Sequence, residues 1–211
     1  MFKAAFVSIL ISLLMVPNTM ALDWSAGDKS DINAVELFFN ELNTYRAQFI
    51  QISPEGRSSE GWLWIERPRR LRVEYAPPTN LLIVANGTFL IFVDRDIDQV
   101  SKYSYEAGPF RFLLKEKVDF TEDMVVNAIY REAGLLNLTL VDEDNPEAGS
   151  VTISFKETPM NLVGWTVIDS NGLKTEVSLH NPSFGLTFPK KLFRFTAHDQ
   201  VRGDYRYGAY E

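Results

Sequence analysis

The chain has 211 residues, of which 45% are hydrophobic and 13% aromatic, and its formal net charge at pH 7 is -7. The acidic balance argues against a nucleic acid partner, because binding to phosphates requires a basic surface. The chain contains no cysteine, which excludes disulfide bonds and the thiol through which a bacterial lipoprotein is lipidated.

The first 21 residues are typical of a secretory signal peptide. Lys3 precedes an uncharged run from 4 to 16, and Pro17-Asn18-Thr19-Met20-Ala21 places small residues where a signal peptidase cuts. A retained membrane anchor is the alternative, but a span needs about 18 or more apolar residues and this run is shorter. We expect cleavage after about Ala21 and a soluble exported protein in which residues 22–211 form a single domain.

Apolar residues at helical spacing predict an amphipathic helix that begins at Asp31, with Asp31 or Ser30 as its N-cap. The polar, small segment 24–30 precedes it. The apolar face consists of Ile32, Val35, Phe38, Phe39, Leu42 and Tyr45. Phe38 and Leu42 are candidates for contact with an apolar ligand, and packing of Phe38 and Phe39 against a sheet is the alternative.

From Ala47 onward, short strand patterns alternate with turn signals. These signals are Pro54-Glu55-Gly56, Arg67-Pro68, Pro77-Pro78, Asn86-Gly87, Asp144-Asn145-Pro146, Asn171-Gly172 and Asn181-Pro182. No long helical pattern separates the strands, so a meander of sequential antiparallel strands is the simplest topology. The chain is therefore predicted to be mainly β, in an α+β arrangement with one N-terminal helix.

The segment 61–75 predicts a hairpin with large rings on its strands and a basic turn at Arg67-Pro68. If four residues form the turn, Trp62, Trp64, Val73 and Tyr75 share one face. We take this shared face as the candidate ligand surface. Arg70 and Arg72 are expected on the outer face of a strand, either solvated or as part of a positive patch for anionic lipid or an acidic partner.

A short helix is predicted near Gly108–Lys115, because Pro109 is well placed at a helix start. The helix carries Phe110, Phe112, Leu113 and Leu114. So many apolar side chains must cover an apolar surface. The helix either plugs the open end of a barrel as core or forms a lid over a ligand cavity.

The sequence contains few of the motifs that are typical of enzymes. It has two histidines, no cysteine, and no nucleophile elbow, phosphate-binding loop or cluster of zinc ligands. The run Asp94–Asp98 opens like a calcium loop, but Gln99 and Tyr105 stand where glycine and the closing glutamate are needed. We expect no catalytic residue, no metal and no cofactor.

An ordered set of residues resembles the outer-membrane lipoprotein carrier (LolA) family. The resemblance begins at Tyr45-Arg46-Ala47-Gln48-Phe49-Ile50-Gln51 and spans about residues 33–114. It continues through Gly61, Leu63, Trp64, Arg67, Pro68, Pro77, Leu82, Val84, Gly87 and Leu90 to the lid helix at Pro109-Phe110. Beyond Leu114 only the strand rhythm and the run 191–195 are similar.

The resemblance implies an unclosed antiparallel β-barrel with an apolar concave face and helices over its mouth. It implies that Arg67, followed by Pro68, latches the lid through hydrogen bonds to the lid backbone. The residues expected at the cavity and lid are Phe38, Leu42, Trp62, Trp64, Leu71, Val73, Tyr75, Phe92, Phe110 and Leu113.

The family further implies a periplasmic, monomeric carrier of acylated lipoproteins. Such a carrier takes its cargo from an inner-membrane lipoprotein-releasing ABC transporter and passes it to an outer-membrane receptor, where the host has one. A related half-barrel protein that carries free lipid or another amphiphile, or that acts as an envelope sensor, is the alternative.

Overall fold

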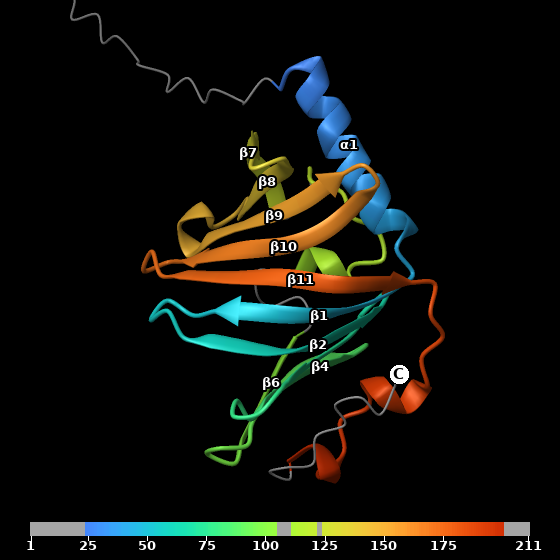
Figure 1. Cartoon of the computed structure of the whole chain (residues 1–211), viewed down its shortest axis with the longest axis vertical. Coiled ribbons are helices and arrows are strands. Elements are labelled where there is room, and N and C mark those ends of the chain that lie inside the picture. The colour runs from blue at the N-terminus through green and yellow to red at the C-terminus, as the bar shows by residue number, and fades with distance from the viewer. Residues whose placement is uncertain (1–23, 105–110, 122–123, 201–211) are drawn as a thin grey trace, which may run out of the picture.

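An open antiparallel sheet forms most of the molecule (Figure 1). The computed structural model describes residues 24–104, 111–121 and 124–200. Within these residues the sheet has 11 strands in the order β6-β5-β4-β3-β2-β1-β11-β10-β9-β8-β7. The strands are β1 (Thr44–Ile52), β2 (Ser58–Glu66), β3 (Arg70–Tyr75), β4 (Leu81–Asn86), β5 (Phe89–Asp94), β6 (Gln99–Ser104), β7 (Met124–Glu132), β8 (Leu135–Asp142), β9 (Gly149–Glu157), β10 (Met160–Asp169) and β11 (Lys174–Phe184).

The strand order confirms the predicted meander and the unclosed barrel. All pairs but one join neighbours in the sequence, and the exception, β1 with β11, joins the two meanders. Strands β6 and β7 lie at opposite edges and do not pair with each other, so the sheet stays open. The predicted signal peptide lies outside the described residues.

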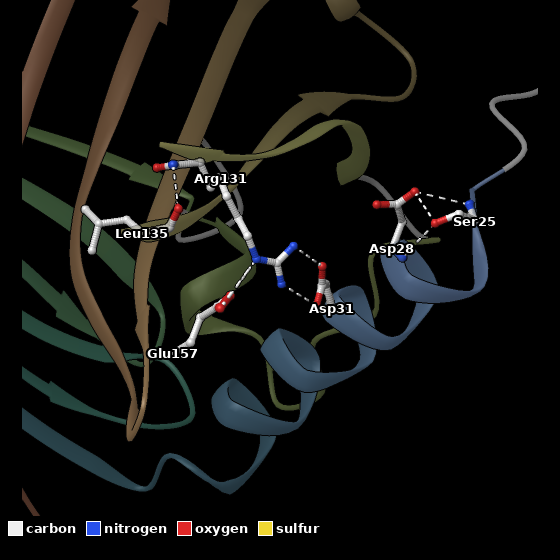
Figure 2. A network of polar contacts seen from close by, with 7 residues as sticks. Ser25, Asp28, Asp31, Arg131, Leu135 and Glu157 are labelled. Atoms are coloured by element: carbon white, nitrogen blue, oxygen red, sulfur yellow. Dashed lines mark hydrogen bonds and ion pairs between the residues drawn. The ribbon is translucent and has the colours of Figure 1, made fainter. Parts of the chain in front are cut away.

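The N-terminal helix α1 (Ala26–Glu41) begins five residues before the predicted start at Asp31. Ser25 and Asp28 form a capping box, in which the Ser25 hydroxyl accepts the Asp28 N–H and the Asp28 carboxylate accepts the Ser25 N–H, both at 3.1 Å (Figure 2). The box satisfies two amides at the helix start, so the small, polar residues that follow Ser25 join the helix. The predicted cap at Ser30 or Asp31 was wrong.

Two helices cover the concave face of the sheet. Val35 and Phe39 of α1 belong to the same core cluster as Phe112, Leu113 and Leu114 of the short helix α2 (Arg111–Leu114). Phe38 and Phe39 both lie edge-to-face against Phe155 of β9, with ring centroids 5.3 and 5.7 Å apart. The structure thus shows Phe38 and Phe39 packed on the sheet, and Leu42 is buried in the same cluster.

Residues after β11 cover the convex face of the β1–β6 half. The chain leaves β11 and runs back beside that half through the 3-10 helices Lys190–Phe193 and Ala197–Gln200 (Figure 1). Trp62 and Trp64 pack there against Phe188, Leu192 and Phe193. A third 3-10 helix, Pro146–Ala148, lies between β8 and β9. Residues 61–65 of β2 are therefore buried on both faces of the sheet.

A buried ionic network holds this C-terminal cover in place. The Arg72 guanidinium donates to Glu74 Oε2 at 2.9 Å and to Asp199 Oδ1 at 3.0 Å, and all three side chains are almost fully buried. Arg95 Nε donates to the Asp199 carbonyl at 2.8 Å. Burial alone would raise the pKa of Asp199, but hydrogen bonds from Thr196 and the charge of Arg72 together lower it. Arg72 thus lies on the outer face of the sheet, as predicted, but it is buried there and not solvated.

Candidate functional site

The length of the β2–β3 turn decides which residues face the concave side. Arg67–Arg69 form a three-residue turn between the paired Glu66 and Arg70, with Arg69 at φ 65°. Trp64 consequently lies opposite Arg72, and Leu63 lies opposite Val73. The four-residue turn assumed from the sequence was wrong, and with it the common face for Trp62, Trp64, Val73 and Tyr75, because one residue of slip exchanges the two faces.

An apolar cavity of about 240 Å³ lies between the concave face and α2. It is lined by Phe49, Gln51, Leu63, Leu71, Val73, Tyr75, Ile83, Leu90, Phe92, Arg111, Leu113, Leu114, Trp165, Val167, Thr175 and Val177. A second hollow of about 620 Å³ shares Tyr75, Ile83, Leu90 and Phe92 with it and continues along β5 and β6. Together they form one apolar surface from α2 toward the β6 edge of the sheet.

The structure brings only some of the predicted ligand residues to this cavity. Leu71, Val73, Tyr75, Phe92 and Leu113 line it. Trp62 and Trp64 lie on the opposite face under the C-terminal cover, Phe38 and Leu42 lie in the neighbouring core, and Phe110 is outside the described residues. The wall from β10 and β11, which includes Trp165, Val167 and Val177, was missed, although the strand alternation around these residues was recognised.

Most of the cavity lining is apolar, and its few polar side chains include Gln51, Tyr75, Arg111 and Thr175. The Tyr75 hydroxyl donates to Gln51 Oε1 at 2.8 Å, and burial raises the pKa of Tyr75 to about 12, so the phenol stays neutral at neutral pH. Arg111 turns to Asp142 of β8 at 2.7 Å, and this bond holds the pKa of the Asp142 carboxyl below its usual range. The cavity therefore suits hydrocarbon and offers little for charge recognition.

The β2–β3 turn holds the end of α2 on the cavity. Arg67 Nη2 donates to the Lys115 carbonyl at 2.6 Å, and the Arg69 N–H donates to the Leu114 carbonyl at 2.9 Å. Both carbonyls belong to the end of the helix, where no further turn satisfies them. This geometry is compatible with the latch role that the family resemblance gives to Arg67, whereas Pro68 lies exposed in the same turn.

Arg67 holds this position at an electrostatic disadvantage. Its side chain is partly buried, and its Nε and Nη1 atoms have no hydrogen-bond partner among the described residues. Burial lowers the pKa of Arg67 to about 10, so the guanidinium is still charged at neutral pH. Water would solvate this charge better than the partly buried position against α2 does, so desolvation opposes part of the free energy that the hydrogen bond gains.

The segment after α2 is fastened to α1 by side-chain bonds that the sequence did not reveal. Asn40 binds the backbone of Val118 on both sides, with Nδ2 donating to the carbonyl at 2.9 Å and Oδ1 accepting the N–H at 2.7 Å. Glu36 Oε1 accepts the Phe120 N–H at 2.7 Å. We call residues 111–121 the lid segment. These bonds join it to α1.

A second group of contacts fastens α1 to the β7–β9 part of the sheet (Figure 2). Arg131 of β7 donates to both carboxylate oxygens of Asp31 at 3.0 and 3.1 Å and to Glu157 of β9 at 2.8 Å. The lid, α1 and β7–β9 are therefore linked to one another. The Arg67–Arg69 turn, which belongs to the β1–β6 half of the sheet, contacts the end of α2.

The described residues offer no metal site. Across 24–104, 111–121 and 124–200, no three His, Cys, Asp or Glu residues lie close enough together to hold an ion. Asp94, in the run that opens like a calcium loop, accepts the Asp96 N–H at 2.9 Å, as in an ordinary turn. Within the same ranges, no helix has both the length and the apolarity to span a membrane.

Replacing Asn40 with alanine should loosen the lid segment without unfolding the sheet. Without the Asn40 acceptor, the Val118 amide should exchange about tenfold faster with solvent, because a hydrogen bond of this kind is worth about 1 kcal/mol or more. Hydrogen exchange measured on residues 111–121 tests this. Asn43→Ala is the control, because the Asn43 side chain bonds, among the described residues, only to the nearby Glu41 carbonyl, and its backbone carbonyl, which accepts the Arg67 N–H, is kept in the variant. Equal exchange in both variants would show that Asn40 does not hold the lid segment.

Comparison with known proteins identifies the family to which the sequence is similar. The family model described as "Outer membrane lipoprotein carrier protein LolA" matches residues 40–196. Outer-membrane lipoprotein carrier proteins of Methylococcus capsulatus (strain Bath) and Legionella pneumophila (strain Corby) are 24% and 27% identical to this chain. These matches cover 82% and 74% of this chain and 86% and 80% of the two relatives.

Two further proteins are similar but uncharacterised. One from Rickettsia prowazekii (strain Madrid E) is 30% identical over 120 residues, which are 56% of each of the two chains. A conserved protein from Thermus thermophilus has a solved structure that shares the fold, with a TM-score of 0.51 at 10% identity over 82% of this chain and 98% of that chain. Since the family model covers most of the sequence, the chain belongs to the outer membrane lipoprotein carrier (LolA) family.

Proposed function

We propose that this protein is a periplasmic carrier that shelters lipoprotein acyl chains in its concave cavity and transfers them from the inner to the outer membrane. The observation that carries the proposal is the almost wholly apolar cavity beneath α2 in a chain of the LolA family. An inner-membrane ABC transporter would supply the cargo, and an outer-membrane receptor, where present, would accept it. The carrier would act as a monomer, without catalysis or cofactor.

The closed cavity is too small for a whole acyl chain. Pockets that enclose drug-sized ligands measure about 300–1000 Å³, and the space under α2 is about 240 Å³. A whole chain would therefore extend from this space into the adjoining hollow along β5 and β6, and α2 would move to admit it. The contacts from Arg67 and Arg69 must then break.

The closed lid also keeps the cargo releasable. Burial of an acyl chain gains about 0.8 kcal/mol per methylene, so a chain of roughly 15 methylenes gains about 12 kcal/mol. Two or three sheltered chains would exceed the practical limit of about 20 kcal/mol for reversible binding. Closure of the empty cavity, through apolar packing of α2 and the Arg67 contact, offsets part of this gain.

A carrier of free lipid or another amphiphile is the second candidate. The observation that favours it is the lining itself, because hydrocarbon walls do not distinguish the acyl chains of a lipoprotein from those of a phospholipid. Any selection for lipoproteins would have to act on the polar part of the cargo, at the rim.

Phe92→Ser should weaken binding of a fluorescent triacylated lipopeptide about tenfold, since a buried phenylalanine side chain contributes about 1.5–3 kcal/mol. Phe92 lines both hollows and is 39% exposed in the closed form. Phe89→Ser is the matched control, because Phe89 lies on the same strand, is 47% exposed and points to the opposite face. Equal affinities for Phe92→Ser, Phe89→Ser and wild type would contradict binding on the concave face.

Arg67→Leu should retain the fold and hold cargo longer. Without the bond to Lys115 the empty closed form loses stability relative to the loaded form, so handover of a lipopeptide to acceptor vesicles should slow by up to about tenfold. Stopped-flow transfer measures this, with Arg57→Leu as the control because the Arg57 side chain is 81% exposed at the β1–β2 turn. Loading and transfer at wild-type rates in Arg67→Leu would show that Arg67 is not a latch.

A further inference from the structure

A basic groove lies on the convex face, next to the turn that holds the lid. It encloses about 340 Å³ and is lined by Arg70, Asn86, Lys190, Phe193, Arg194, Phe195 and Thr196. No carboxylate is among these residues. The groove is formed by the start of β3, the end of β4 and the C-terminal cover, segments that are far apart in the sequence.

The cations of the groove are available to a partner. Lys190 and Arg194 of the groove are exposed, as is the neighbouring Lys191 outside it, and no ion pair joins any of them to another residue of the described ranges. Arg70 forms a partly buried ion pair with Glu66. The nearest acids of the cover and of β3, Asp199 and Glu74, are buried and already bound to Arg72. The face is therefore locally positive on a chain whose net charge is -7.

The groove is held in a defined shape. Leu192 and Phe193 are buried against Trp62 and Trp64, so the flanking Lys190 and Arg194 point outward. The Arg194 N–H donates to the Lys191 carbonyl at 3.2 Å, and the Thr196 N–H donates to Asp199 at 2.6 Å. A fixed arrangement of cations loses less conformational entropy on binding than free lysine side chains do.

We propose that this groove is a docking site for an acidic, carboxylate-bearing segment of a partner protein. Its recessed shape, with Phe193 and Phe195 as walls, suits a protruding peptide segment better than a flat surface. An anionic bilayer would also face the acidic remainder of the chain, and charges are screened only beyond about 8 Å at physiological salt. Charge complementarity thus favours a local acidic segment over a charged membrane.

The groove lies beside the turn that contacts the end of α2. Arg70 directly follows the Arg67–Arg69 turn, whose other side holds the end of α2. A partner bound at Arg70 and Arg194 therefore lies beside the contacts that break when the lid opens. The docking site is independent of the identity of the cargo, because none of its residues lines the cavity.

A fluorescent oligoglutamate peptide tests the site on the mature protein, with oligoglutamine as the uncharged probe. Anisotropy at low salt should show binding of oligoglutamate alone, and the double variant Lys190→Glu/Arg194→Glu should bind at least about tenfold more weakly. Lys102→Glu/Lys156→Glu is the matched control, because it makes the same change in net charge at exposed lysines outside the groove. The neutral pair Lys190→Gln/Arg194→Gln should show a smaller loss.

Two results would overturn the proposal. Equal losses in both charge-reversal variants would show that only net charge matters, and binding of phosphatidylglycerol vesicles through Lys190 and Arg194 with no binding of oligoglutamate would assign the groove to lipid. Loading of a fluorescent lipopeptide, measured on the same variants, should stay at the wild-type level. Failure of wild type to load would count against the carrier function and leave the result for the groove intact.

Discussion

The length of one turn determines how the two faces of the sheet are used. Because three residues, Arg67–Arg69, separate the paired Glu66 and Arg70, Leu63 and Val73 face the concave side while Trp64 and Arg72 face the convex side. The first pair helps to form a hydrocarbon-lined cavity, and the second is buried under the C-terminal cover. A turn longer by one residue would place a charged arginine of β3 in the cavity and its valine against the cover. The same turn also meets the end of α2, so it positions both the cavity wall and the lid contact.

The lid segment is bonded to α1 and β8 on one side, whereas its contact with Arg67 on the other side is weakened by desolvation of the guanidinium. Asn40, Glu36 and Arg111 bind the lid segment to α1 and β8 through short hydrogen bonds and an ion pair. Across the cavity, Arg67 makes a charged hydrogen bond but remains partly desolvated, with two nitrogen atoms unsatisfied by the described residues. The bond and the desolvation act in opposite directions, so the closed form gains only part of the free energy of the bond. A small difference between closed and open forms suits a carrier that must both take up and release its cargo.

Local patterns predicted the strands, the meander and the short helix at 111–114, because strand alternation, turn residues and a proline signal act over a few residues. Placement of Arg67 at the lid followed from the family resemblance and not from the pattern, which by itself favours a solvated turn arginine. The helix start was missed because a capping box needs only Ser25 and Asp28, and the surrounding residues carry no apolar periodicity. Burial of Arg72 was not predictable, since its partner Asp199 lies 127 positions away, and the Asn40–Val118 bond likewise spans 78 positions. The faces of β2 and β3 were misassigned because the turn length could not be determined from residue types alone.

The concave cavity is proposed to hold the acyl chains of lipoproteins. Native mass spectrometry with lipid extraction, performed on the mature protein purified from the periplasm of its own host, tests this claim most directly. If the cavity holds lipoprotein acyl chains, acylated peptides should copurify with the protein in a defined ratio. Free phospholipid without any lipopeptide would contradict the lipoprotein assignment and support the lipid-carrier alternative. An empty protein that also fails to bind added triacylated lipopeptide would contradict the carrier function itself.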